Sequence, residues 1–239
     1  MAKQPGIFLT AEWSNLLMLN YVVRPSLLER FVPAGTELDT FEGKAYLSLV
    51  GFGFNRKRIC GIPMPFHHAF EEVNLRFYVR RSSKRGVVFF RELVPKFAVA
   101  AIARFVFNEN YSSVPMSHRI ETGADGTVTE AEYAWSWGKD RFAMQIETDG
   151  ASFLPPDASE SQFITEHYWG YAAQPDGGCL EYEVQHPRWN VWKAKTADFT
   201  GNATRLYGDE IAHGLMREPD SAFLANGSPV TVFKGRRIC

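Results

Sequence analysis

The sequence predicts a mainly β, α+β fold of antiparallel strands with two or three helices. The first observation is composition, because 14% of the 239 residues are aromatic and aromatic side chains favour pleated, half-buried surfaces. The second is a series of short alternating apolar segments separated by turns that contain Gly or Pro. The third is that strands do not alternate regularly with long helices, as they would in a parallel sheet.

The predicted elements follow one another in strand–turn–strand order. Residues 15–23 predict a strand, and Pro25 opens a short helix over 26–31 because its missing N–H needs no partner in a first turn. We predict hairpins that pair 36–41 with 44–54, 70–80 with 87–93, and 127–137 with 141–149. The remaining predictions are a buried helix over 96–107, strands over 181–186 and 191–199, a helix over 203–213 capped by Asn202, and a closing strand over 229–234.

Residues 1–239 are expected to form one domain, since 45% of them are hydrophobic and neither a repeat nor a linker interrupts them. The formal net charge of −1 gives no general attraction to nucleic acid or to an anionic membrane, so neither is an expected partner. The most apolar stretch, 97–107, is too short to span a bilayer and contains Arg104. The sequence leaves the oligomeric state open, a homo-oligomer included.

Cysteine usage and the N-terminus indicate a cytoplasmic protein. Cys60, Cys179 and Cys239 are odd in number and far apart, which argues against a disulfide framework or a zinc knot. The N-terminal residues lack the long apolar stretch of a secretory signal. His67 and His68 precede two glutamates, but on a strand they would point to opposite faces, so we expect no metal and no cofactor.

Residues 70–80 carry the most informative pattern, because side chains two apart share one face of a strand. One face is apolar and consists of Val73, Leu75, Phe77 and Val79. The other is polar and consists of Glu72, Asn74, Arg76 and Tyr78. The polar row is either a solvent-facing surface or the wall of a cavity. In a cavity, Arg76 would bind a carboxylate or phosphate, Glu72 would hold the guanidinium, and Tyr78 would supply a hydrogen bond.

Several motifs, in order and spacing, resemble the YqjF-like family of uncharacterised proteins. They are Asn20-Tyr-Val-Val, Val32-Pro-Ala-Gly, Tyr46-Leu-Ser-Leu-Val-Gly-Phe, Glu72-Val-Asn-Leu-Arg-Phe-Tyr-Val, Gly86-Val-Val-Phe, Thr165-Glu-His-Tyr and His186-Pro-Arg-Trp. Together they cover most of the chain. The family belongs to the acetoacetate-decarboxylase-like superfamily, so the resemblance implies a curved antiparallel double sheet or barrel around an internal cavity. This favours the cavity interpretation of the polar row.

The resemblance also raises the question of whether this sequence has the residues of a decarboxylase. That chemistry needs a lysine that forms a Schiff base beside a second cation. The stretch from Arg91 to Lys96 is similar to the decarboxylase segment Arg-Glu-Leu followed by Pro-Lys-Lys, but it is shorter and Phe97 replaces the second lysine. Lys96 is therefore a catalytic candidate, with Arg91 as a possible substitute for the missing charge. The alternative is that Lys96 is a solvated residue in the first turn of a helix.

Two later segments have the mixture of aromatic and polar groups that is typical of pocket walls. In the family the segment with His186 and Trp189 belongs to the second half of the barrel, where both side chains would line the same cavity. The alternative is that they are ordinary residues of a strand interrupted by proline. Residues 166–171 and 108–111 have a similar mixture.

Three hypotheses of function follow. The first is binding of a small organic acid or carbonyl metabolite in an internal cavity, with Glu72, Asn74, Arg76, Tyr78, Arg91, His186 and Trp189 as ligand contacts. The second is a Schiff-base lyase or decarboxylase-like enzyme that uses Lys96. The third is a non-catalytic structural or partner-binding domain whose polar row faces solvent. The usual hydrolase and nucleotide-binding motifs are missing from the sequence.

Overall fold

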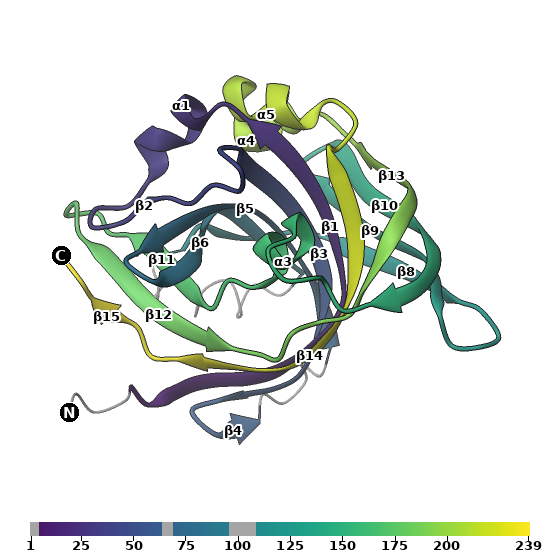
Figure 1. Ribbon diagram of the computed structural model, residues 1–239, viewed down its shortest axis with the longest axis horizontal. Helices are drawn as coiled ribbons and strands as arrows, with labels where there is room; N and C mark the ends of the chain where they lie inside the picture. The colour runs from purple at the N-terminus through teal and green to yellow at the C-terminus, as the bar shows by residue number, and fades with distance from the viewer. Residues whose placement is uncertain (1–4, 64–68, 96–108) are drawn as a thin grey trace.

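The computed structural model describes residues 5–63, 69–95 and 109–239 (Figure 1). Its helices are α1 (Pro25–Leu28), the 3-10 helix η1 (Glu29–Phe31), α3 (Glu160–Thr165), α4 (Ala203–Tyr207) and α5 (Asp209–Leu215). Its strands are β1 (Ile7–Val23), β2 (Glu37–Leu38), β3 (Ala45–Ile59), β4 (Ile62–Pro63), β5 (Ala69–Arg81), β6 (Lys84–Val94), β7 (Tyr111–Ser113), β8 (Met116–Thr122), β9 (Val128–Trp137), β10 (Asp140–Phe153), β11 (Trp169–Ala173), β12 (Cys179–Gln185), β13 (Val191–Thr200), β14 (Ser221–Phe233) and β15 (Arg236–Arg237).

One large sheet contains all of these strands, and part of it curves into a ring around α3 (Figure 1). The ring follows the order β12, β11, β6, β5, β3, β1 and β14, and β14 pairs again with β12. That last pairing joins Val184 to Val232 and Gln185 to Thr231 only, so the ring is not a closed barrel. Strands β13, β10, β9 and β8 continue from β14 as a wing on one side.

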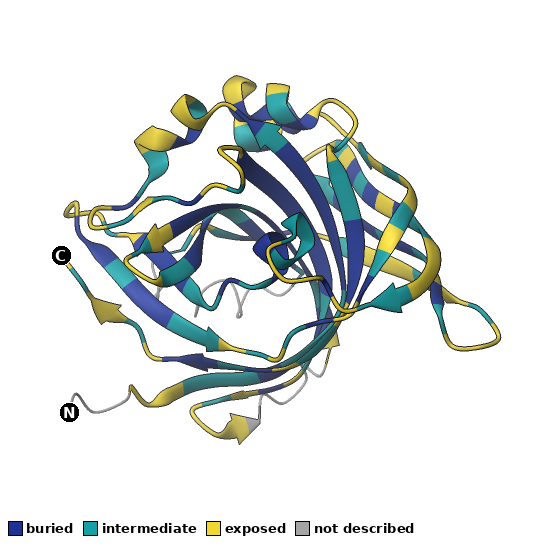
Figure 2. Cartoon of the chain, viewed as in Figure 1, coloured by how far each residue is buried: buried dark blue, intermediate teal, exposed yellow. Residues whose placement is uncertain are grey.

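Several ring strands are buried on both faces over part of their length, and Figure 2 shows this as buried colour along the second half of β1 and most of β3. The outer face includes Leu47 and Leu75, which belong to one hydrophobic cluster with Leu206 of α4 and Ile211 of α5. The inner face belongs to a second cluster, in which Phe163 of α3 is packed with aromatic residues of β3 and β5. Continuous burial on both faces explains why these strands are rich in large apolar residues.

Three β-bulges change which side chains reach the inside of the ring. In β1 and β3 the extra residues lie at Asn15 and Arg56, both of which have positive φ, 52° and 46°. In β6 the extra residue is Phe90, because Leu75 pairs with Arg91 whereas the next residue of β5 pairs with Phe89. A bulge reverses the inward and outward alternation beyond it. After Arg56 and Phe90, residues that a regular strand would turn outward therefore face inward.

Most of the predicted elements are confirmed. The hairpins predicted over 70–93 and 127–149 are β5–β6 and β9–β10, and the helix over 26–31 is α1 with η1. The helix predicted over 203–213 is divided into α4 and α5 at Gly208, whose φ of 81° is outside the helical region. Asn202 precedes α4 but makes no side-chain capping hydrogen bond.

Other predictions are corrected by the sheet topology. The hairpin predicted between 36–41 and 44–54 is reduced to one isolated bridge from Phe41 to Lys44, because β2 pairs with β5 instead. The sheet is mixed, since β6 runs parallel to both β7 and β11. The predicted helix over 96–107, the catalytic candidate Lys96 and the pair His67 and His68 lie outside the described residues. Within the described ranges, no helix has the length and apolar character needed to cross a membrane.

Candidate functional site

A cavity of about 140 Å³ lies inside the ring. Strands β1, β3, β5, β6 and β12 contribute to its wall, as do residues 164–167 and the segment between β12 and β13. Much of the wall is aromatic, and Trp13, Phe52, Phe54, Phe89 and Trp189 belong to it. An engineered cavity of similar volume holds benzene, so the space suits a ligand of about that size.

The polar row of β5 faces this interior and not solvent. Glu72, Asn74 and Arg76 line the cavity, and the first two are 4% and 2% exposed. Tyr78 lies on the same face but is fully buried and is not part of the cavity wall. Its hydroxyl donates a hydrogen bond to Ser48 Oγ at 2.6 Å, so it supports the wall from behind.

Arg76 has an unusual environment for a guanidinium. Its Nη2 lies 4.0 Å from Met18 Sδ, and its Cζ lies 5.8 Å from the centroid of the Tyr78 ring. In the described part of the chain no ion pair includes Arg76, and its Nε is buried without a hydrogen-bond partner. The expected Glu72–Arg76 ion pair is therefore absent there, and Glu72 Oε1 accepts a hydrogen bond from Asn74 Nδ2 at 3.2 Å instead.

Opposite the apolar wall lies an acidic cluster, which consists of Glu72, Glu92 and Glu109. Glu92 is 1% exposed and pairs directly with Asn74 across β5 and β6. The carboxyl groups of Glu92 and Glu109 are hydrogen-bonded to each other. The cluster is thus a connected network of carboxyl groups inside the protein.

Two tyrosines complete this network. The Tyr111 hydroxyl is hydrogen-bonded to both Glu72 and Glu92, and the Tyr182 hydroxyl donates to Glu109 Oε1. Tyr182 lies over Gly170, where the methyl group of an alanine would be 2.0 Å from the ring atom Cζ. A side chain at position 170 would therefore push the Tyr182 hydroxyl away from Glu109.

The acidic cluster is mostly protonated at neutral pH. Burial raises the pKa of Glu72 to about 8, and the charge of Glu109 adds to the effect. Burial also raises the pKa of Glu109 to about 7, and it raises the pKa of Glu92 well above its usual range with help from the charges of the other two. Because arginine side chains keep their charge in proteins, the cavity wall carries positive charge below neutral pH.

Lys57 is a cavity residue that the sequence analysis missed. It is 5% exposed, its Nζ lies 3.9 Å from the centroid of the Phe70 ring, and it donates a hydrogen bond to the carbonyl oxygen of Phe54 at 3.3 Å. The bulge at Arg56 turns it inward. The alternation of apolar and polar residues in the sequence does not reveal such a bulge, so Lys57 could not be identified as a cavity residue from it.

Two histidines in the wall are neutral at pH 7. His186 stacks on Trp189 with ring centroids 4.1 Å apart, and both line the cavity. Burial lowers the pKa of His186 to about 4, and the Arg76 charge acts in the same direction. Burial also lowers the pKa of His167 to about 4, although its Nε2 lies 3.5 Å from Asp39 Oδ2. Both imidazoles can therefore accept a proton or a hydrogen bond.

Arg91 is not in the cavity wall of the described structure. Its Nη1 donates to Ser112 Oγ at 3.4 Å, and its guanidinium lies 4.8 Å from the centroid of the Trp137 ring. The bulge at Phe90 explains the difference, since it places Glu92 on the cavity face that a regular strand would give to Arg91. The acidic cluster could not be anticipated without this bulge.

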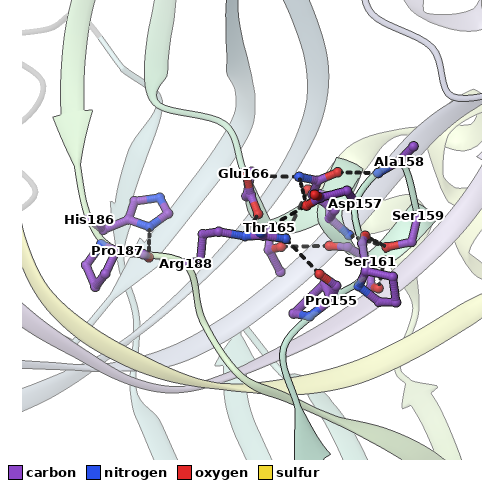
Figure 3. Close-up of polar contacts among 12 residues, drawn as sticks. Pro155, Asp157, Ala158, Ser159, Ser161, Thr165, Glu166, His186, Pro187 and Arg188 are labelled. Carbon is purple, nitrogen blue, oxygen red and sulfur yellow. Dashed lines mark hydrogen bonds and ion pairs between the residues drawn. The ribbon is translucent and has the colours of Figure 1, made fainter.

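Arg188 fastens two cavity segments to each other, and Figure 3 shows its side chain reaching across to the loop before α3. Nη2 donates to the carbonyl oxygen of Pro155 at 2.7 Å, Nη1 lies 3.0 Å from Asp157 Oδ1, and Nε lies 2.5 Å from Glu166 Oε1. His186 lies two residues before Arg188, so this fork fixes the position of the imidazole relative to α3.

Comparison with known protein families identifies relatives of the whole chain. The family model DUF2071, described as an uncharacterized conserved protein, matches residues 10–229. The Uncharacterized protein YqjF of Bacillus subtilis (strain 168) is 37% identical over 206 residues, which cover 85% of this chain and 83% of that protein.

Solved structures share the fold at low sequence identity. An acetoacetate decarboxylase-like enzyme from Sphingomonas wittichii RW1 has a TM-score of 0.70 at 11% identity, covering 96% of this chain and 92% of that one. Enduracididine biosynthesis enzyme MppR, complexed with pyruvate, has a TM-score of 0.68 at 15% identity, covering 99% and 91%. Acetoacetate decarboxylase from Legionella pneumophila has a TM-score of 0.68 at 12% identity, covering 100% and 90%. These matches show a common fold alone.

The raised pKa of Glu72 predicts a specific pH dependence of stability. Because the folded-state pKa of about 8 is above the ordinary 4.5, the contribution of this carboxyl is fully present below 4.5 and is lost as the pH rises to about 8. Glu72→Gln should remove this loss, which is at most about 1.4 kcal/mol per pH unit. Urea denaturation between about pH 5 and about pH 9 measures it, with exposed Glu218→Gln as the control. Parallel profiles for Glu72→Gln and the wild type would contradict the assignment.

The Arg188 fork predicts a stability effect larger than that of an ordinary surface arginine. Arg188→Met should lower the free energy of unfolding by more than a typical surface substitution does, because two partly buried acceptors, the Pro155 carbonyl oxygen and Glu166, lose their donor together with exposed Asp157. Arg205→Met is the matched control, since Arg205 is more exposed and has one partner, Asp140. It should change stability by less than about 0.5 kcal/mol in the same urea titration. Equal losses of stability in Arg188→Met and Arg205→Met would show that the three contacts of Arg188 stabilise the fold no more than one surface ion pair does.

Proposed function

The chain belongs to the DUF2071 family of uncharacterized conserved proteins, and on that basis we propose that it binds a small organic acid or carbonyl metabolite in its internal cavity. The observation that carries the proposal is the Arg76 guanidinium, which lines the cavity without an ion-pair partner among the described residues. Arg76 is half-buried with its Nε fully buried, so its charge is partly removed from water without a counter-ion, and a ligand carboxylate would reduce that penalty. Arg also binds carboxylates through two parallel hydrogen bonds.

The rest of the wall supports a ligand that is partly apolar. Aromatic rings cover most of the cavity, so a short carbon chain would be buried against them. The carboxyl group of Glu72, protonated at neutral pH, supplies a hydrogen-bond donor for a carbonyl oxygen. This combination of one charge, one neutral donor and an apolar remainder suits a small oxo acid.

Size and fold support the same class of ligand. Pyruvate has as many heavy atoms as benzene, so it suits a cavity of about 140 Å³. MppR, which shares the fold, has been solved in complex with pyruvate. Pyruvate and acetoacetate are therefore the first probes for this chain. The third hypothesis, a structural domain, depended on a solvent-facing polar row, whereas the row lines the cavity.

Thermal-shift titrations with pyruvate and with acetoacetate test the proposal. The wild type should be stabilised in a concentration-dependent way, and Arg76→Met should lose that stabilisation because the counter-charge of the ligand is removed. Arg80→Met is the matched control, since Arg80 is on the same strand but half-exposed and paired with Glu37. It should respond as the wild type does. Stabilisation that survives in Arg76→Met would remove the guanidinium from the binding site.

A second candidate function rests on Lys57, whose amine lies in the cavity wall. A primary amine can add to a ligand carbonyl and lose water to give an imine, which is the chemistry of a Schiff-base lyase. Lys57 would then take the role that the sequence analysis considered for Lys96.

Borohydride trapping decides this second candidate. Reduction in the presence of pyruvate or acetoacetate should add the mass of the reduced ligand to a peptide that contains Lys57. Lys57→Met should abolish the adduct, and Lys44→Met, which removes an exposed lysine, should not. An adduct on Lys96 would move the role to that residue, and an unmodified protein would exclude imine chemistry with these two probes.

A further inference from the structure

We propose that the acidic cluster is an acid–base centre, in which Glu92 takes a proton from the carbon next to the carbonyl group of a bound oxo acid and returns it, so that the protein enolises its ligand. This inference rests on the proposed binding function and extends it from binding to proton transfer at carbon.

The first step of the argument is an oxygen atom without a partner. Glu92 is 1% exposed and lines the cavity, and its Oε2 has no hydrogen-bond partner among the described residues. Asn74, which faces it across β5 and β6, also has an unpartnered buried oxygen, Oδ1. Buried polar atoms are normally hydrogen-bonded. Two such atoms side by side in one wall indicate that a ligand group or water is their partner.

The second step is the connection of Glu92 to another carboxyl group. Because Glu92 and Glu109 are hydrogen-bonded to each other, one proton must lie between them. Tyr182 donates to Glu109, and Tyr111 is hydrogen-bonded to Glu92, so negative charge left on the pair is stabilised. A pair that holds one proton can accept a second one at Glu92 Oε2, because the first proton passes from Glu92 to Glu109 in the same step.

The third step is the distance between Arg76, which would hold the ligand carboxylate, and Glu92, which would take the proton. Arg76 and Asn74 are two apart on β5, so they are about 7 Å apart along the strand, and Glu92 is paired with Asn74. An oxo acid held at Arg76 by its carboxylate therefore extends along the wall toward Glu92. The raised pKa of Glu109, about 7, is consistent with a pair that both takes and returns a proton near neutral pH.

The reaction balances without an oxidant or reductant. The C–H bond of the ligand breaks and its proton forms an O–H bond with Glu92 Oε2. The released electron pair forms a carbon–carbon double bond, and the carbonyl π electrons move to oxygen. The guanidinium of Arg76 and the protonated carboxyl of Glu72 stabilise the resulting oxyanion. The reverse step returns a proton to carbon, and in heavy water it returns a deuteron.

Proton NMR in heavy water tests this inference. The methyl signal of pyruvate, or the methylene signal of acetoacetate, should disappear faster with the full-length wild-type protein than in a protein-free sample. Glu92→Gln should slow this exchange by about 100-fold, because it removes the group that carries the proton. Glu218→Gln, at an exposed position, should exchange as the wild type does. A thermal shift by the same ligand shows that Glu92→Gln is folded and still binds it.

The outcomes separate this inference from the proposed function. Binding of either probe without exchange would overturn enolisation and leave the binding proposal intact, whereas no binding of either probe would remove both. Exchange that disappears in Lys57→Met and persists in Glu92→Gln would assign proton loss to an imine and overturn the role of Glu92. Exchange that persists in Lys57→Met and fails in Glu92→Gln supports the role of Glu92.

Discussion

The cavity depends on the alternation of side chains along the strands, because each ring strand has to give one face to the interior and the other to the outer core. β5 alternates regularly along its length, so its apolar face joins the outer core and its polar face lines the cavity. β3 and β6 alternate regularly only as far as Arg56 and Phe90. Beyond these bulges the inward positions belong to Lys57 and Glu92. The chemistry of the cavity is therefore decided by two extra residues that do not line the cavity themselves.

Burial alone does not determine the charge of a carboxyl group in this fold. Glu181 and Glu92 are both 1% exposed. Burial raises the pKa of Glu181, but hydrogen bonds from Lys84 and Arg236, at 2.6 Å and 2.8 Å, more than offset it, and the pKa ends below its usual range. Glu92 has other carboxyl groups as neighbours, and its pKa rises. The ion pairs of Glu181 hold β6, β12 and β15 together, whereas the surroundings of Glu92 leave a carboxyl group that can exchange a proton.

The sequence was sufficient for features that depend on local periodicity. The two confirmed hairpins and the division of β5 into an apolar and a polar face follow from alternation and turn residues that are adjacent in the chain. Alternation did not decide which of the two faces lines the cavity. Which side chains of β3 and β6 face inward beyond their bulges does not follow from alternation, because a bulge leaves no signal in the composition. For that reason Arg91 was selected in place of Glu92. The pairing of β2 with β5 and the approach of Glu109 to Glu92 depend on contacts distant in sequence, which periodicity does not report.

The cavity contains three glutamates, and yet its polarity suits an anion. The reason is that burial acts on acids and on arginine unequally. A carboxyl group removed from water can take up a proton and become neutral, whereas an arginine guanidinium keeps its charge in proteins. The aromatic wall that excludes water therefore cancels most of the negative charge of Glu72, Glu92 and Glu109 near neutral pH and leaves the positive charge in place. A count of charged residues would assign this site to cations, and desolvation reverses that assignment.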